Sequence, residues 1–170
     1  MNRLVLGIVV LLLAAGCGYH TPTAGDAWVG GEGRVLHVEL FANRTVEPYL
    51  DTIVTDEVTA QLSRSRLATL VEDRGAADLL LTGTVTGFAS QVAAYDTNDR
   101  ISEYQARMTV NARLTRRSDG SVLWQEELSR SETYAARLDK GQQQGEESQA
   151  ARVVAKRIAE DLLARLLTVF

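Results

Sequence analysis

The sequence predicts an α+β fold: a two-layer sandwich in which a four-stranded mixed sheet carries two helices on one face, in the order β-α-β-β-β-α. The first observation is a clean two-residue alternation of apolar and polar side chains over residues 102–115. The second is a spacing of three and four residues between apolar positions in two other segments, 50–62 and 146–167. The third is composition, since 45% hydrophobic and 24% charged residues are ordinary values for a globular chain.

The first half of the chain predicts a strand, a helix and a second strand. In residues 34–41, apolar side chains alternate with polar ones and should share one face; they are Leu36, Val38 and Leu40. A helix is expected to start near Pro48, a residue suited to a first turn. Its apolar face is formed by Leu50, Ile53, Val54, Val58 and Leu62. Residues 78–91 predict the second strand, in which Leu79, Leu81, Val85 and Ala89 share a face, and its Gly83 and Gly87 indicate a bulge or a strong twist.

The second half predicts a pair of strands and a closing helix. The alternating strand 102–115 is followed by the turn residues Ser118-Asp119-Gly120 and a return strand over 122–133, with Val122, Trp124 and Leu128 on one side. A Gln-rich break is expected at 141–145, before a helix over 146–167. The strand-helix-strand crossover should make its two strands parallel if they are neighbours, and the last three strands should form an antiparallel meander.

The N-terminus predicts export and lipidation. Arg3 is followed by an apolar run over residues 4–15, which has the layout of a secretory signal and is too short for a comfortable transmembrane helix. The segment Leu13-Ala14-Ala15-Gly16-Cys17 resembles the lipobox of bacterial lipoproteins. The alternative is an ordinary signal peptide with an incidental cysteine, the only Cys in the chain.

The lipobox resemblance divides the chain into a signal peptide over residues 1–16, a lipidated tether over 17–33 and a folded domain over 34–170. It implies that Cys17 carries a covalent diacylglycerol and an N-acyl lipid, and no other cofactor is expected. Two or more acyl chains give stable membrane anchoring. Gly18 stands where an Asp tends to retain lipoproteins in the inner membrane, so the resemblance implies the periplasmic side of the outer membrane.

The residues that enzymes and metal sites need are largely missing. One Cys and two His cannot supply a tetrahedral Cys/His zinc site from one chain. The sequence contains no nucleophile elbow, no zinc-protease motif and no Walker loop. A net charge of −4 gives no support to nucleic-acid binding. We therefore predict that the protein is not an enzyme, holds no metal and has no nucleic-acid partner.

Several segments, taken in order, resemble the LptE family, the lipoprotein partners of the lipopolysaccharide-assembly barrel LptD. They are Cys17-Gly18-Tyr19-His20, Phe41-Ala42-Asn43-Arg44-Thr45, the strand Glu103-Tyr104-Gln105-Ala106-Arg107-Met108-Thr109-Val110-Asn111-Ala112, Trp124, Ser131-Glu132-Thr133-Tyr134 and the terminal helix. The resemblance implies an outer-membrane lipoprotein that plugs and supports the LptD β-barrel. It also implies lipopolysaccharide binding during assembly into the outer leaflet.

The resemblance also suggests where each partner is bound. Lipopolysaccharide contact is expected at the loop over residues 93–102 and the loop before the last helix, whose basic candidates are Arg100, Arg137 and Lys140. Asp96 and Asp99 flank Arg100 and reduce the positive charge there. The candidates for barrel contact are Tyr95, Arg107 and Asn111. For all of these candidates except Tyr95, simple solvent exposure is the alternative.

A second resemblance leads to another function. A strand, then Phe41-Ala42-Asn43-Arg44-Thr45, then a helix and a strand are also similar to envelope lipoproteins that activate peptidoglycan synthases and to the related TolB amino-terminal fold. The long strand 102–115 and the closing helix favour the LptE family. The identity of the partner, a β-barrel or a peptidoglycan synthase, separates the two hypotheses.

Overall fold

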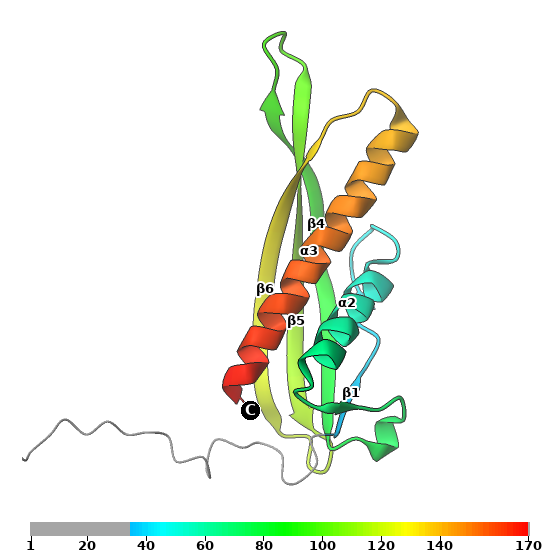
Figure 1. Ribbon diagram of the computed structural model, residues 1–170, viewed down its shortest axis with the longest axis vertical. Helices are drawn as coiled ribbons and strands as arrows, with labels where there is room; N and C mark the ends of the chain where they lie inside the picture. Colours follow the sequence, from blue (N-terminus) through cyan, green and yellow to red (C-terminus); the bar gives the residue numbers. More distant parts are fainter. Residues whose placement is uncertain (1–34, 170) are drawn as a thin grey trace, which may run out of the picture.

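The computed structural model describes residues 35–169, so the predicted signal peptide, Cys17 and the tether lie outside the described residues. The elements, shown in Figure 1, are β1 (Val35–Val38), β2 (Ala42–Asn43), α2 (Leu50–Ser65), β3 (Thr69–Leu70), the 3₁₀ turn η1 (Arg74–Ala76), β4 (Leu79–Tyr95), β5 (Ile101–Arg116), β6 (Val122–Ala135) and α3 (Lys140–Val169).

The described strands form one mixed sheet of six strands, in the order β3-β1-β4-β5-β6 with β2 also paired to β4. β1 is parallel to β4, and β4, β5 and β6 form an antiparallel meander, both as predicted. The predicted number of strands, four, was wrong. β2 and β3 contain only two residues each, and a two-residue strand is too short to show the alternation by which strands are recognised in a sequence.

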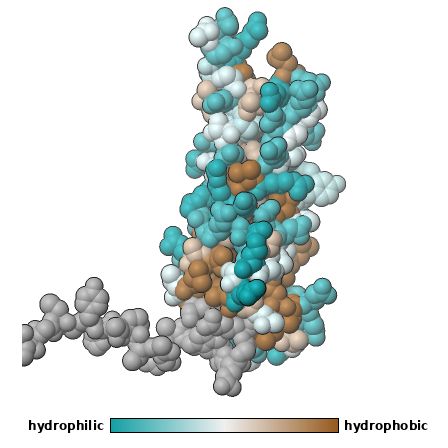
Figure 2. All heavy atoms as spheres, viewed as in Figure 1, coloured by the Kyte–Doolittle hydropathy of each residue, from teal (hydrophilic) through white to brown (hydrophobic). Residues whose placement is uncertain are grey.

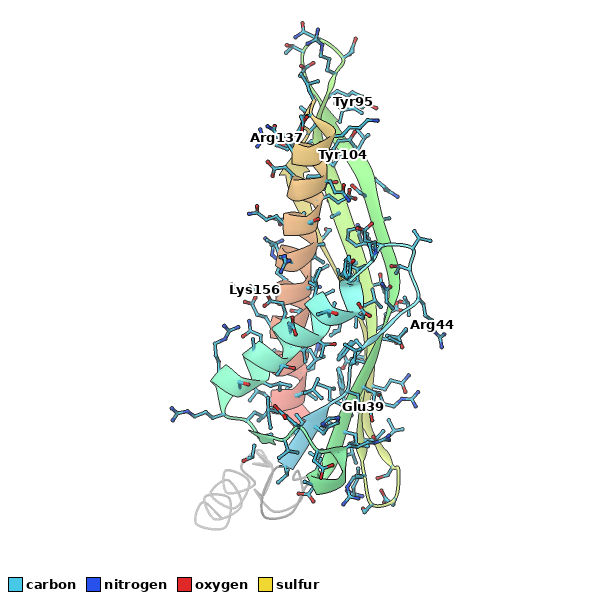
Figure 3. All side chains as sticks on the ribbon, turned by 90° about the vertical axis from the view of Figure 1, so that its right-hand side faces the viewer. Glu39, Arg44, Tyr95, Tyr104, Arg137 and Lys156 are labelled. Carbon is cyan, nitrogen blue, oxygen red and sulfur yellow. The ribbon has the colours of Figure 1, made fainter. Side chains whose placement is uncertain are left out.

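The two predicted helices are present, and in Figure 3 they lie on the same side of the sheet. α2 buries the face predicted for it, with Leu50, Val54, Val58 and Leu62 inside. α3 buries eight residues along its length and packs against β5, β6 and α2. The other face of the sheet carries mainly Thr, Ser, Gln, Asn, Arg and Glu side chains. Burial of apolar surface between helices and sheet is therefore the main contribution that holds the fold together.

The two glycines of β4 have different roles. A Cβ on Gly83 would lie 2.0 Å from Cε1 of Phe41, so Gly83 makes room for that buried ring. Gly87 follows a register shift between Val85 and Gly87, which confirms a bulge at one of the two predicted positions. The extra residue moves Phe88 to the core side of the strand and leaves Ala89 exposed, so the prediction that Ala89 shares the buried face was wrong.

The first strand is shorter than predicted. β1 ends at Val38, and Leu40 is 66% exposed instead of buried beside Leu36. The chain turns after Val38 so that Phe41 enters the core. The Phe41 N–H donates a hydrogen bond of 3.0 Å to Oγ1 of Thr55, which ties this bend to α2.

The last helix begins earlier than predicted, at Lys140, and includes the Gln-rich residues 141–145 that were expected to form a break. Asp139 precedes it, and Oδ1 of Asp139 accepts the N–H of Gln142 at 2.9 Å. A side-chain acceptor at this place satisfies an otherwise unpaired N–H of the first turn. This bond supports the helix start and offsets the poor helix propensity of the two glycines that follow.

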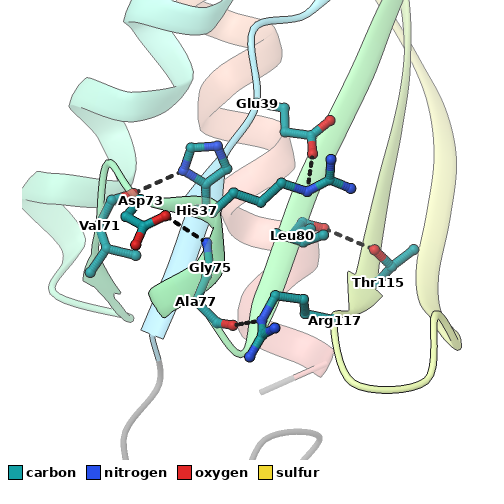
Figure 4. Close-up of polar contacts among 10 residues, drawn as sticks. His37, Glu39, Val71, Asp73, Gly75, Ala77, Leu80, Thr115 and Arg117 are labelled. Carbon is teal, nitrogen blue, oxygen red and sulfur yellow. Dashed lines mark hydrogen bonds and ion pairs between the residues drawn. The ribbon is translucent and has the colours of Figure 1, made fainter.

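Polar contacts join neighbouring segments at the end of the molecule where the described chain begins (Figure 4). His37 Nδ1 lies 3.0 Å from the carbonyl oxygen of Val71, and Nε of Arg74 lies 3.1 Å from Oε1 of Glu39. Nε of Arg117 donates to the carbonyl of Ala77. His37 thus has a structural contact with the backbone of Val71.

Three ion pairs join α3 to the edge strand β6. Their partners alternate in sign along both elements and are Glu132–Arg157 at 2.6 Å, Arg130–Asp161 at 2.6 Å and Glu126–Arg165 at 3.4 Å. The three helix residues lie four apart, so they form one stripe of α3. We call this set the ion-pair ladder.

Candidate functional site

The hairpin between β4 and β5 extends beyond the helices at one end of the molecule (Figure 1). Its turn, residues 96–100, is organised by Asp96, whose Oδ1 accepts the N–H of Asn98 at 2.7 Å and that of Arg100 at 3.0 Å. These two bonds, with Arg100 the stronger contributor, lower the pKa of Asp96 below its usual value. The turn therefore holds a fixed carboxylate beside Arg100.

A shallow cavity of about 430 Å³ lies beneath this hairpin. We call it the tip hollow; it is lined by Asp96, Arg100, Ile101, Tyr104, Ala136, Arg137 and Leu138. Tyr95, Tyr104 and Arg137 are labelled at this end in Figure 3. Two of the three predicted basic residues, Arg100 and Arg137, are thus brought together although they are far apart in the sequence.

Arg137 already has an anionic partner. Its Nε and Nη2 lie 2.8 and 2.6 Å from Oε1 of Glu146, and its backbone N–H donates to the Gln143 side chain at 2.7 Å. About half of the Arg137 side chain remains exposed, so its outer edge is still accessible to a second anion. Lys140 begins α3, is exposed and does not line the tip hollow.

Apolar side chains surround the same end, and the sequence analysis did not single them out. Leu138 is 100% exposed, and Val92 and Ile101 are 41% and 39% exposed. Tyr95, predicted as a contact residue, is 63% exposed at the end of β4. Val92, Tyr95 and Ile101 are uncovered because the hairpin extends beyond the core, whereas Leu138 lies in the connection between β6 and α3. A local sequence pattern does not carry that information. The tip thus combines cations with an apolar rim.

Two tyrosines support the tip from below. The rings of Tyr104 and Tyr134 stack with centroids 5.8 Å apart, and the Tyr134 hydroxyl shares a hydrogen bond with Oγ of Ser90. Burial is the main reason that the pKa of Tyr134 is raised above its ordinary value. These contacts join β4, β5 and β6 where the projecting hairpin leaves the core.

The helix-free face of the sheet carries the other predicted contact residues. Arg107 is exposed there, and Nδ2 of Asn111 lies 3.3 Å from Oε2 of Glu127. A depression of about 250 Å³ on this face is lined by Thr82, Gly83, Thr84, Asn111, Ala112, Arg113 and Gln125. Nε of Arg113 donates to Oε1 of Gln125 at 3.0 Å. The face is consistently polar, but its side chains are partly paired with one another.

Within residues 35–169, no group of His, Cys, Asp and Glu side chains is arranged to hold a metal ion. In the same part of the chain, no helix has both the length and the apolar character needed to cross a membrane. On the face shown in Figure 2, hydrophobic residues gather mainly at the end opposite the hairpin. The tip hollow and the helix-free face are the two candidate binding surfaces.

Comparison with known families decides which of the resemblances holds. The sequence profile of the LptE family, described as lipopolysaccharide assembly, matches residues 34–166. The chain belongs to the LptE family. Members of this family are non-enzymatic lipopolysaccharide-assembly lipoproteins, which is consistent with the prediction that this chain is not an enzyme. No curated protein matches the chain in sequence.

Solved structures share the fold of this LptE-family chain at low sequence identity. A Xanthomonas campestris protein has a TM-score of 0.59 at 15% identity, covering 81% of this chain and 85% of that one. Rare lipoprotein B from Shewanella oneidensis has a TM-score of 0.53 at 10% identity, covering 78% and 94%. A putative lipoprotein from Caulobacter crescentus has a TM-score of 0.52 at 13% identity, covering 76% and 87%. These likenesses show a shared fold, and the family match supports an LptE-type envelope lipoprotein.

Proposed function

We propose that this LptE-family chain, anchored to the periplasmic side of the outer membrane by lipid on Cys17, plugs and supports the LptD β-barrel. We further propose that it binds lipopolysaccharide on its way to the outer leaflet. The observation that carries the proposal is the family match over residues 34–166, which covers nearly all of the described fold. Both candidate surfaces fit this function in chemical character.

The helix-free face is suited to a polar barrel lumen. Thr, Ser, Gln and Asn side chains predominate on it, and these can exchange hydrogen bonds with a polar wall without inviting nonspecific aggregation. Arg107 and Asn111 lie on this face, and Tyr95 is exposed at the end of β4 nearest the tip. We assign barrel contact to these three residues.

The tip hollow is suited to an amphiphilic phosphate ester. Arg100 and Arg137 can each offer a guanidinium to phosphate oxygens, and Lys140 adds a point charge nearby. The exposed apolar rim, with Leu138 fully uncovered, is compatible with contact to acyl chains. Asp96 and Glu146 reduce the net positive charge, so we expect moderate affinity.

The proposal predicts that replacing Arg100, Arg137 and Lys140 together with Glu lowers lipopolysaccharide binding by about tenfold, because phosphate would then meet carboxylates in place of cations. Binding is measured with purified lipopolysaccharide in a fluorescence assay. The control variant carries the same change in charge at three exposed sites away from the tip: Arg64, Arg152 and Lys156. Equal binding by both variants, with far-UV circular dichroism unchanged, would contradict the assignment.

Partner identity is tested by a pull-down of the tagged, lipidated protein from detergent-solubilised membranes of its host. Recovery of an LptD-type barrel in a one-to-one ratio is the expected result. Recovery of a peptidoglycan synthase in its place would overturn the plug function and favour the regulator hypothesis.

A further inference from the structure

The sheet has two long edges, and they differ in how well their backbone groups are protected. One edge is β6, the last strand of the sheet. The other is the upper part of β4, beyond the point where β2 stops pairing with it. An exposed strand edge presents unpaired backbone N–H and C=O groups, and natural proteins usually protect such edges with charges, prolines or covering segments.

The β6 edge is protected. Nη1 of Arg157 donates to the carbonyl of Ser131 at 3.0 Å, and Nη1 of Arg130 donates to the carbonyl of Ser129 at 2.9 Å. Both arginines belong to the ion-pair ladder, so their positions are fixed by acidic partners. Two outward carbonyls of this edge are therefore occupied, and charged side chains stand beside them.

The upper β4 edge has no such protection. Residues 87–95 contain no Lys, Arg, Asp, Glu or Pro. Pairing on this side of β4 ends where the Arg44 N–H donates to the carbonyl of Val85 at 3.0 Å. Within residues 35–169, no strand pairs with β4 on this side beyond that bond. The result is an open edge without charged side chains that extends to the hairpin tip.

The bulge determines which backbone groups this edge offers. The carbonyl of Val85 points away from β5, since it accepts a bond from the β2 side. The extra residue before Gly87 reverses the alternation, so the polar backbone groups of Phe88, Ser90 and Val92 point outward. Phe88 is partly buried and Val92 is 41% exposed on the helix side of the strand. An added strand would find three outward residues, two of which, Phe88 and Val92, carry apolar side chains.

We propose that the β4 edge over residues 87–95 is a strand-addition site, at which an extended segment of the LptD partner pairs with Phe88, Ser90 and Val92. This inference rests on the function proposed above. An uncharged edge is an aggregation hazard in a freely exposed protein but not where a partner encloses it. The preceding segment of this same chain is a poor candidate, because residues 18–33 contain five glycines and Pro22.

Strand addition recognises its occupant mainly through main-chain hydrogen bonds, while side chains contribute register and specificity. We therefore expect the LptD segment to alternate, with apolar side chains beside Phe88 and Val92 and polar ones on the helix-free face. The binding site would continue the line of β2 along β4 toward the tip.

The first test uses three variants of the full lipidated protein co-expressed with LptD. Val92→Pro removes an outward N–H and leaves the β4–β5 ladder intact, and it should raise the dissociation constant of the complex about fivefold. Val92→Thr keeps the N–H and should bind as the unmodified protein does. Ser131→Pro makes the equivalent change on the protected β6 edge and should have no effect. Equal binding by the Val92→Pro and Val92→Thr variants would overturn the inference.

The second test is hydrogen exchange of the complex and of the free protein, with peptides covering residues 86–95. Slow exchange at Phe88, Ser90 and Val92 only in the complex supports the inference. A complex in which these amides exchange as fast as in the free protein overturns the inference and leaves the proposed function standing. Failure to form any barrel complex removes the proposed function, and this inference with it.

Two other occupants give distinct results in the same experiment. Slow exchange without LptD that depends on protein concentration identifies a second copy of this chain at the edge. Slow exchange without LptD that is independent of concentration and is lost when residues 18–33 are deleted identifies the chain's own preceding segment. Either result overturns the assignment to the partner.

Discussion

Gly83 shows how one missing side chain shapes the core. Its position on β4 faces the ring of Phe41, which is 1% exposed and fills the space that a Cβ would occupy. Gly87, further along the same strand, has only ordinary contacts around it: a Cβ added there would have Cβ of Thr109 as its nearest neighbour, at 3.8 Å. The two glycines of one strand thus differ in what they accommodate.

We predict that Gly83→Ala lowers the free energy of unfolding by about 2 kcal/mol, because the methyl group and the Phe41 ring cannot occupy the same volume. Gly87→Ala is the matched control and should change the free energy of unfolding by less than about 0.5 kcal/mol. Urea denaturation followed by tryptophan fluorescence measures both. Equal midpoints for the two variants would show that Phe41 moves aside without cost.

Tyr134 provides a prediction on pH. Burial raises its pKa in the folded state, while in the unfolded chain it ionises near its ordinary value of 10.0. As pH rises through that value, the unfolded state loses a proton that the folded state retains, so folded stability should fall. When denaturation is measured between pH 8 and 11, the free energy of unfolding should fall more steeply with pH for the unmodified protein than for the Tyr134→Phe variant. Parallel curves would contradict the burial argument.

At the scale of elements, the ion-pair ladder fixes the edge strand to α3. Each of its side chains is partly exposed, so each pair alone should contribute only about 0.3–1 kcal/mol. Its larger role is geometric, since it directs two arginines onto the β6 carbonyls.

A double-mutant cycle on one rung tests this view. Glu132→Arg and Arg157→Glu should each destabilise the fold by about 1 kcal/mol, because each places like charges together. The double variant, in which the two charges are exchanged, should recover much of the lost stability at low salt. The coupling free energy between the two positions should be smaller in 1 M NaCl, because salt screens the charges. Additive effects at both salt concentrations would mean that the two side chains do not interact in solution.

Sequence patterns predicted the long elements well and the irregular ones poorly. The helix stripe from Leu50 to Leu62 and the alternation of β5 follow from periodicity, because each is long enough to reveal one. β2 and β3 are too short for that, and the start of α3 depends on the Asp139 side chain more than on the propensity of residues 141–145. Ala89 was misplaced because a bulge changes the phase of a strand.

The sequence predicted which basic residues lie at the candidate site but not which side chains surround them in the fold. The LptE resemblance identified Arg100 and Arg137, and the fold places both at the tip hollow. The pairing of Arg137 with Glu146 could not be foreseen, because it depends on a helix that begins six residues earlier than the pattern predicts.

At the scale of the whole molecule, folding and anchoring should be separable. Within residues 35–169, 28 apolar residues are buried and form a substantial hydrophobic core. We therefore predict that Cys17→Ser abolishes membrane attachment but leaves the thermal midpoint of the folded domain within about 1 °C. Membrane fractionation and differential scanning fluorimetry measure the two properties. A large drop in midpoint would show that the lipidated segment stabilises the fold.

β4 also determines the length of the molecule along its long axis. A strand of 17 residues spans roughly 56 Å, and in Figure 1 it extends from the end where the described chain begins to the hairpin at the opposite end. The hydrocarbon core of a bilayer is only about 30 Å thick. If the long axis stands across the membrane, a chain tethered in one leaflet holds its tip at or beyond the level of the other. Under the proposed function, the same strand would separate the lipid anchor at Cys17 from the lipopolysaccharide site at the tip.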